Sequence, residues 1–171
     1  MTERDFMSRA LDLAREAGKL DEVPVGAVVV WNGQIIGEGY NRRELSRNAL
    51  AHAELEAIDM ACRRYGSWRL FDCELYVTLE PCPMCTGAII NSRIKKVVFG
   101  AYDPKAVSMG SVLNLCDYPY NSKPEVEGGF MQEECAALLT DFFADLRTRK
   151  IKYRKDADDV SASGAGHGDH A

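Results

Sequence analysis

Three residues that can bind one metal ion, His52, Cys82 and Cys85, constrain the fold of this chain more than any other feature. Cys82 and Cys85 stand three positions apart where a helix is expected to begin, a spacing that puts both side chains on one face. Zinc prefers nitrogen and sulfur ligands in a tetrahedron, and a site with only three protein ligands leaves its fourth position for water. If His52 is the third ligand, the helix start that carries it must converge with the helix start that carries the cysteines.

Glu54 follows His52 by two residues, about 200° round an ideal helix, so it is not expected to share the ligand's face. We interpret Glu54 as a residue that does not bind the metal. Zinc can lower the pKa of bound water from ~15.7 to about 7, and a carboxylate beside that water can take its proton and return it to the substrate. The pattern therefore predicts a hydrolytic site with a general acid/base.

Each of these residues also has a simpler interpretation. His52 alone could be a histidine that packs in the core or caps a helix. Cys82 and Cys85 could form a redox pair, or could bind a structural zinc together with another cysteine. A closed zinc site has no use for Glu54 and usually needs a second Cys/His pair, so the catalytic interpretation is favoured. The other cysteines are expected to be buried thiols: Cys62, Cys73, Cys116 and Cys135.

Length and composition exclude several classes of protein. A chain of 171 residues suits one domain that buries about two thirds of its surface without disulfides. Its 46% hydrophobic and 27% charged residues are ordinary for a globular protein, and no apolar run approaches the ~20 residues that cross a bilayer. The first residues lack the pattern of a secretory signal, so we expect a cytoplasmic location, where a Cys-x-x-Cys indicates metal or redox chemistry.

The net charge of −5 is concentrated at the end of the chain. Residues 156–171 contain four aspartates and no lysine or arginine, which leaves 21 basic and 22 acidic residues over 1–155. The charge therefore does not exclude a nucleic-acid partner, since a local basic patch can still bind phosphate. We predict one folded domain over 1–155 and a disordered acidic tail over 156–171.

Apolar spacing and turn residues predict an alternation of helices and strands. Asn32-Gly33 is a strong hairpin turn, and the order strand, helix, strand around the cysteines predicts a parallel crossover. Together they predict an α/β fold with a mixed sheet and helices on both faces. The expected helices are 2–20, 51–65, 81–91 and 132–149, and the expected strands are 25–30, 34–40, 73–79, 96–101 and 125–127.

The segment His52-Ala53-Glu54, followed by Pro81-Cys82-Pro83-Met84-Cys85, matches the His-x-Glu and Pro-Cys-x-x-Cys signature of the zinc-dependent nucleoside and base deaminases. Within that cytidine-deaminase-like superfamily, the chain resembles the bacterial tRNA-specific adenosine deaminases over roughly positions 5 to 150. The further matching stretches are Val23–Val28, Gly39–Arg42, Val77–Glu80, Arg93-Ile94, Val97–Ala101 with Asp103, and Glu134–Leu139 with Asp141–Phe143.

The resemblance implies a five-stranded sheet between helices, a homodimer, and hydrolytic deamination of adenosine to inosine at the wobble position of a tRNA anticodon. It implies that His52, Cys82 and Cys85 hold one zinc ion and that Glu54 carries the proton. It also implies that the anticodon stem-loop contacts Asn41, Ala53, Asp103, Asn121 and Arg147, with Arg149 and Lys150 as further candidates for phosphate binding.

The residues by themselves leave alternatives open for these contacts. Asn41 and Asp103 stand where turn formation alone would explain them, and a basic helix end complements the helix dipole without any ligand. The zinc motif is also shared by deaminases of free bases or nucleosides, of guanine or cytidine type. A non-catalytic RNA-binding subunit with a structural zinc is a third possibility, which the presence of Glu54 disfavours.

Overall fold

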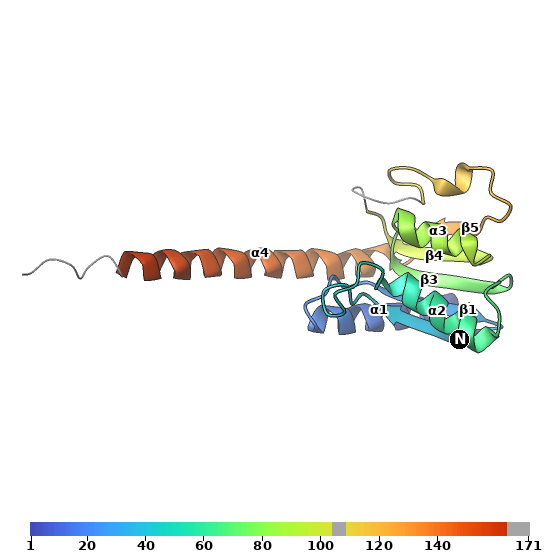
Figure 1. Ribbon diagram of the computed structural model, residues 1–171, viewed down its shortest axis with the longest axis horizontal. Coiled ribbons are helices and arrows are strands. Elements are labelled where there is room, and N and C mark those ends of the chain that lie inside the picture. Colours follow the sequence, from blue (N-terminus) through green and yellow to red (C-terminus); the bar gives the residue numbers. More distant parts are fainter. Residues whose placement is uncertain (104–108, 164–171) are drawn as a thin grey trace, which may run out of the picture. The chain divides into compact units, whose positions relative to one another are not determined.

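The computed structural model describes residues 1–103 and 109–163, with side chains as far as residue 157. The chain divides into one compact unit over Met1–Leu139 and a second that starts at Thr140. The first unit holds a five-stranded sheet in the order β2-β1-β3-β4-β5, shown in Figure 1. Its strands are β1 (Gly26–Trp31), β2 (Gln34–Tyr40), β3 (Cys73–Leu79), β4 (Lys96–Ala101) and β5 (Glu125–Gly128).

The sheet is mixed, as the sequence predicts. β1 pairs antiparallel with both β2 and β3, whereas β3–β4 and β4–β5 are parallel. Asn32 and Gly33 both have positive φ, the conformation that a tight hairpin turn requires. Helix α3 (Pro83–Asn91) connects the parallel strands β3 and β4, so the predicted crossover is confirmed.

Helices cover both faces of the sheet. Helix α1 (Glu3–Lys19) begins at Thr2, whose side chain forms a capping box with Asp5, and packs its apolar stripe on one face. The first residues of α4, notably the buried Cys135, contribute to the same layer. The opposite face packs against α2 (Ala53–Tyr65) and α3. These two helices share the layer in which the predicted metal ligands lie.

Two glycines on β2 let α2 approach the sheet closely. A Cβ atom added at Gly37 would collide with the Ala57 carbonyl oxygen, and one at Gly39 with the Ala53 carbonyl oxygen. The facing residues on α2 are alanines, so backbone packs against backbone at the start of the helix. This contact fixes where α2 begins relative to the sheet.

The end of the chain differs from the prediction. Helix α4 runs over Gln132–Ser163 and so includes residues 156–163, which the sequence assigned to a disordered tail. That assignment depended on the lack of apolar residues to pack, but the lysines and arginines of 147–155 favour helix without any packing, and the helix that they form continues into the start of the predicted tail. Residues 164–171 of the predicted tail lie outside the described part of the chain. None of the helices described is long and apolar enough to cross a membrane.

Candidate metal centre

The three predicted ligands lie at the starts of two helices. His52 is the N-cap of α2, with extended backbone at φ −87° and ψ 150°, so it precedes the helix rather than lying in its first turn as predicted. Cys82 is the N-cap of α3, Pro83 follows at the first helical position, and Cys85 lies within the first turn. Neither His52 nor Cys82 caps its helix through its side chain, so both side chains remain free to point at a common centre.

The distances within this group suit a tetrahedral zinc ion. Nδ1 of His52 lies 3.7 Å from Sγ of Cys82 and 3.5 Å from Sγ of Cys85. Bond lengths of about 2.0 Å to nitrogen and about 2.3 Å to sulfur place two ligands of one tetrahedron about 3.6 Å apart. Among the described residues, His52, Cys82 and Cys85 form the one group of potential ligands this close together. One imidazole and two thiols, with no fourth ligand in the part of the chain that the structure describes, are the donor set of a zinc site with an open position.

The local charges favour a bound cation. A hydrogen bond from the Cys85 thiol is the main cause that lowers the pKa of Cys82 to about 4, and the same bond together with burial raises the pKa of Cys85. The Cys82 sulfur also raises the pKa of His52. A zinc ion would bind both sulfurs as thiolates.

Glu54 lies beside the ligands without belonging to their group. Its side chain is only 4% exposed, and burial is the main cause that raises the pKa of its carboxyl to about 7. Its position in the first turn of α2, just after His52, places it on the wall of the cavity described next. The prediction that Glu54 is a non-ligand carboxylate beside the metal agrees with this geometry.

A cavity of about 330 Å³ opens onto this centre. We call His52, Glu54 and Cys82, together with the adjoining ligand Cys85, which does not itself line the cavity, the metal floor. The rim is Asp103 with the loop of residues 41–50, of which Asn41 and Arg43 line the cavity. The remaining wall is formed by Glu80 and by four apolar residues, Val23, Val25, Ala53 and Leu79. The volume lies at the lower end of the range for small-molecule sites, which is enough room for a single base or nucleoside.

Three of the five predicted substrate contacts line this cavity: Asn41, Ala53 and Asp103. Asn41 is nearly buried, donates a hydrogen bond from Nδ2 to the Val23 carbonyl and accepts one from the Arg43 backbone N–H. Asn121 is exposed in the segment before β5 and does not line the cavity, and Arg147 is exposed on α4 in the second unit. The roles of all five residues as RNA contacts stay predictions.

The comparisons with known proteins agree with this geometry. Residues 1–101 match the family described as the cytidine and deoxycytidylate deaminase zinc-binding region. The chain belongs to this family. His52 and the two cysteines lie within the matched residues, so zinc is the metal that the donor set and the family both indicate.

The relatives of this deaminase domain include enzymes that act on tRNA. The chain is 48% identical over 151 residues to the tRNA-specific adenosine deaminase of Bacillus subtilis, covering 88% of this chain and 94% of that protein. A solved structure from a study of A-to-I editing by tRNA:A34 deaminases superposes with a TM-score of 0.78 at 42% identity, over 80% of this chain and all of the other. A guanine deaminase from Bacillus subtilis matches with a TM-score of 0.58 at 45% identity, over 60% of this chain and 66% of the other.

Two charged residues of this deaminase domain were missed by the sequence reasoning, Arg43 and Glu80. Glu80 is 1% exposed and its Oε1 accepts the Ser111 backbone N–H at 3.0 Å. Its Oε2 has no hydrogen-bond partner among the described residues, and burial raises the pKa of the carboxyl. A charged residue that follows a buried strand and directly precedes Pro81-Cys82 was the available signal, because the ends of strands commonly border binding sites.

Proposed function

We propose that this protein is a zinc-dependent hydrolytic deaminase that converts adenosine to inosine at the wobble position of a tRNA anticodon. The observation that carries the proposal is the buried Glu54 beside a three-ligand metal group that faces a cavity sized for one nucleoside. A structural zinc needs neither an open position nor a buried carboxylate beside it. For that reason a non-catalytic RNA-binding subunit is disfavoured.

Each residue of the metal floor has a distinct role in this reaction. Zinc, when bound by His52, Cys82 and Cys85, supplies Lewis-acid activation of water at neutral pH. Glu54 takes a proton from the attacking water and delivers it to the purine, so that the exocyclic amine leaves as ammonia and a carbonyl oxygen remains at C6. The balance is one adenosine and one water consumed, and one inosine and one ammonia released.

The walls of the cavity orient the base and exclude solvent. Val23, Val25 and Leu79 offer apolar contacts to the faces of a purine, and Asn41 is held rigidly by its own hydrogen bonds at the cavity wall. A base inside a stacked duplex cannot enter such a site, so the target nucleotide must be unpaired or turned out of its stack. An anticodon loop presents unpaired bases that can be turned out of their stack.

The tRNA substrate is supported by relatives that are named for it and that match most of this chain. The same resemblance supports a homodimer. The N-terminal residues, which lack the pattern of a secretory signal, support a cytoplasmic location, and the acidic composition after residue 155 supports a catalytic domain that ends there. Size-exclusion chromatography with light scattering tests the dimer. A monomer at micromolar concentration would remove that part of the proposal without affecting the chemistry.

A second candidate function is deamination of free guanine. The match to a guanine deaminase at 45% identity favours this candidate specifically, since such an enzyme shares the same zinc motif. The two candidates are separated by incubating the zinc-loaded protein with an anticodon stem-loop RNA, free guanine and free cytidine under the same conditions. Inosine formation in the stem-loop supports the proposal, and ammonia release from a free base alone would overturn it.

A further inference from the structure

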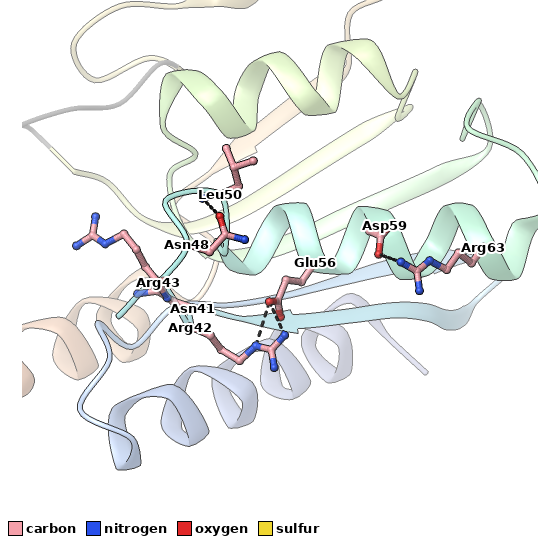
Figure 2. Close-up of polar contacts among 8 residues, drawn as sticks. All are labelled: Asn41, Arg42, Arg43, Asn48, Leu50, Glu56, Asp59 and Arg63. Atoms are coloured by element: carbon pink, nitrogen blue, oxygen red, sulfur yellow. Dashed lines mark hydrogen bonds and ion pairs between the residues drawn. The ribbon is translucent and has the colours of Figure 1, made fainter. Parts of the chain in front are cut away.

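Two neighbouring arginines on the rim, Arg42 and Arg43, have opposite environments (Figure 2). Nε and Nη2 of Arg42 both donate to Oε1 of Glu56, at 3.0 and 2.7 Å, so this guanidinium is held by α2. The Arg43 side chain extends away from that pair, and its guanidinium forms no ion pair or hydrogen bond with any residue that the structure describes. Arg43 therefore retains all of its donors for a ligand.

The loop that carries Arg43 is fixed in place. The Arg43 backbone N–H donates to Oδ1 of Asn41, and its carbonyl accepts the Asn48 N–H at 3.1 Å. The buried Glu22 carboxylate accepts the N–H groups of the next two residues, Glu44 and Leu45. A free guanidinium on a backbone anchored this firmly is positioned before any ligand binds, which lowers the entropic cost of contact.

The charge distribution around the cavity gives Arg43 a distinct role. Three carboxylates line the cavity, Glu54, Glu80 and Asp103, whereas Arg43 is the single lysine or arginine among its described lining residues. A neutral purine can enter such an acidic cavity without penalty, but the phosphates attached to its ribose cannot approach carboxylates favourably. Outside the metal floor, where a bound zinc ion would add its own positive charge, an anionic group of the substrate is attracted only to the part of the cavity that Arg43 occupies.

We propose that Arg43 binds a backbone phosphate flanking the target nucleoside, and so makes this site prefer a nucleotide within an RNA chain to a free base or nucleoside. This inference rests on the proposed function and specifies how the substrate is recognised. A guanidinium suits the task because its planar donors match two phosphate oxygens at once. Arg42 cannot substitute for it, because Nε and Nη2 hold its guanidinium on Glu56 of α2 and Arg42 does not line the cavity.

The first experiment compares kcat/KM for the stem-loop RNA between the wild type and Arg43→Gln, both zinc-loaded. We expect kcat/KM to fall about ten-fold in Arg43→Gln through an increase in KM, since one charge-assisted contact to phosphate disappears. The slope of log KM against log salt should become shallower by about 0.7, the value for one phosphate contact on a single strand. Arg63→Gln is the matched control, because Arg63 is an exposed arginine of α2 that pairs with Asp59 and does not line the cavity.

A second experiment identifies the phosphate. Stem-loop RNAs are prepared with a neutral methylphosphonate at the phosphate on the 5′ side or on the 3′ side of the target adenosine. At one of these two positions the neutral linkage should reduce kcat/KM for the wild type about ten-fold and have little effect on Arg43→Gln, because both changes remove the same contact. Melting temperature and zinc content, measured for every variant, separate a lost contact from a misfolded loop.

Three outcomes would overturn the inference. Arg43→Gln could keep the KM and the salt slope of the wild type, or its kcat/KM could fall only as much as that of Arg63→Gln. The third is that, at both phosphate positions, the neutral linkage reduces kcat/KM as much in Arg43→Gln as in the wild type. These outcomes leave the proposed function intact, since the wild type would still form inosine. If the wild type itself fails on the stem-loop and deaminates a free base, the proposed function fails and this inference with it.

Discussion

The metal floor and the rim of the same cavity are built in opposite ways. The floor residues lie at the starts of α2 and α3, are buried or half-buried, and are held by helices that pack on the sheet. Residues 43–50 of the rim are exposed and are held by hydrogen bonds within the loop and to the buried Glu22. The floor can therefore carry a reaction shared by the whole family, whereas the rim can change the substrate without disturbing the metal.

Because of this difference, substitutions in the two regions should change different measured quantities. Substitutions in the floor are expected to affect metal content or the chemical step, while changes at the rim are expected to affect the binding of substrate.

Cys85→Ala should abolish both zinc binding and deamination. Two remaining ligands bind zinc far more weakly than three, and without the metal no nucleophile forms at neutral pH. Metal analysis of the purified protein should find about one zinc per chain in the wild type and almost none in the variant. Cys62→Ala, which removes a half-buried thiol of α2 outside the site, should keep its zinc. Full zinc content in Cys85→Ala would contradict the assigned ligand set.

Glu54→Gln should retain zinc but reduce the rate of inosine formation by about 10²- to 10⁴-fold, because an amide cannot carry the proton. The decrease should lie in kcat, since Glu54 belongs to the floor. Glu80→Gln is a demanding control: it neutralises another buried carboxylate of the same cavity, yet its amide oxygen can still accept the Ser111 N–H. An equal loss of kcat in both variants would show that charge in the cavity matters, rather than proton transfer by Glu54.

Gly39→Ala tests whether the floor depends on the packing of α2. The added methyl group would collide with the Ala53 carbonyl oxygen and push the start of the helix, with His52, away from the sheet. We expect a loss of about 1–3 kcal/mol in the free energy of unfolding, and weaker zinc binding. Gly87→Ala on α3 should not lower the free energy of unfolding, since none of the neighbouring atoms described lies within 4 Å of the added methyl group. Thermal unfolding and a competitive zinc titration measure the two effects, and unchanged zinc affinity in Gly39→Ala would show that the floor tolerates movement of α2.

Salt is expected to weaken substrate binding at the rim and to leave the chemical step at the metal floor unchanged. Phosphate contacts release counterions, so raising the salt concentration from 50 to 200 mM should increase KM for the stem-loop roughly several-fold. The value of kcat at saturating RNA should hardly change, because the buried floor is poorly screened. Steady-state kinetics across a salt series measures both quantities. A kcat that falls with salt at constant KM would break the separation between the two regions.

The contact between Arg9 and Glu38 lies outside the cavity, so a substitution there should have a small effect on stability and none on deamination. Arg9 on α1 pairs with Glu38 on β2 through two hydrogen bonds, and this contact holds the pKa of Glu38 below its ordinary value of 4.5. A lowered pKa means that the contact stabilises the fold above pH ~4.5 and that this stabilisation disappears as pH falls through the pKa of the folded state. Glu38→Gln should therefore cost about 0.5–1 kcal/mol at pH 7 and less below pH 4, by denaturant unfolding. If the loss in free energy of unfolding were larger at acidic pH than at pH 7, the direction of this pH dependence would be wrong. A change in the rate of deamination would show that this edge of the sheet affects the site.

Much of the fold could be predicted because its signals are local. The ranges of β2, β3 and β4 were predicted without error, since alternation and apolar runs bounded by turn residues mark buried strands clearly. The start of α2 was misplaced by two residues. His52 looks helical in sequence, but an N-cap with extended backbone lets its ring turn toward the cysteines instead of along the helix. The extent of α4 was underestimated because the disorder prediction considered packing alone.

The sequence predicted the chemistry proposed for this protein: zinc held by His52, Cys82 and Cys85, and Glu54 as the proton carrier beside them, within a layered α/β fold. These follow from short motifs whose residue types and spacings have few alternative explanations. The tertiary structure was needed to show which side chains line the cavity and that Glu80 is buried there. It also showed that, among the described residues, one Glu80 oxygen and the Arg43 guanidinium have no partner, while Arg42 is held by Glu56. Adjacent arginines have the same sequence pattern, and what distinguishes them is a carboxylate on another element, a contact that no local signal encodes.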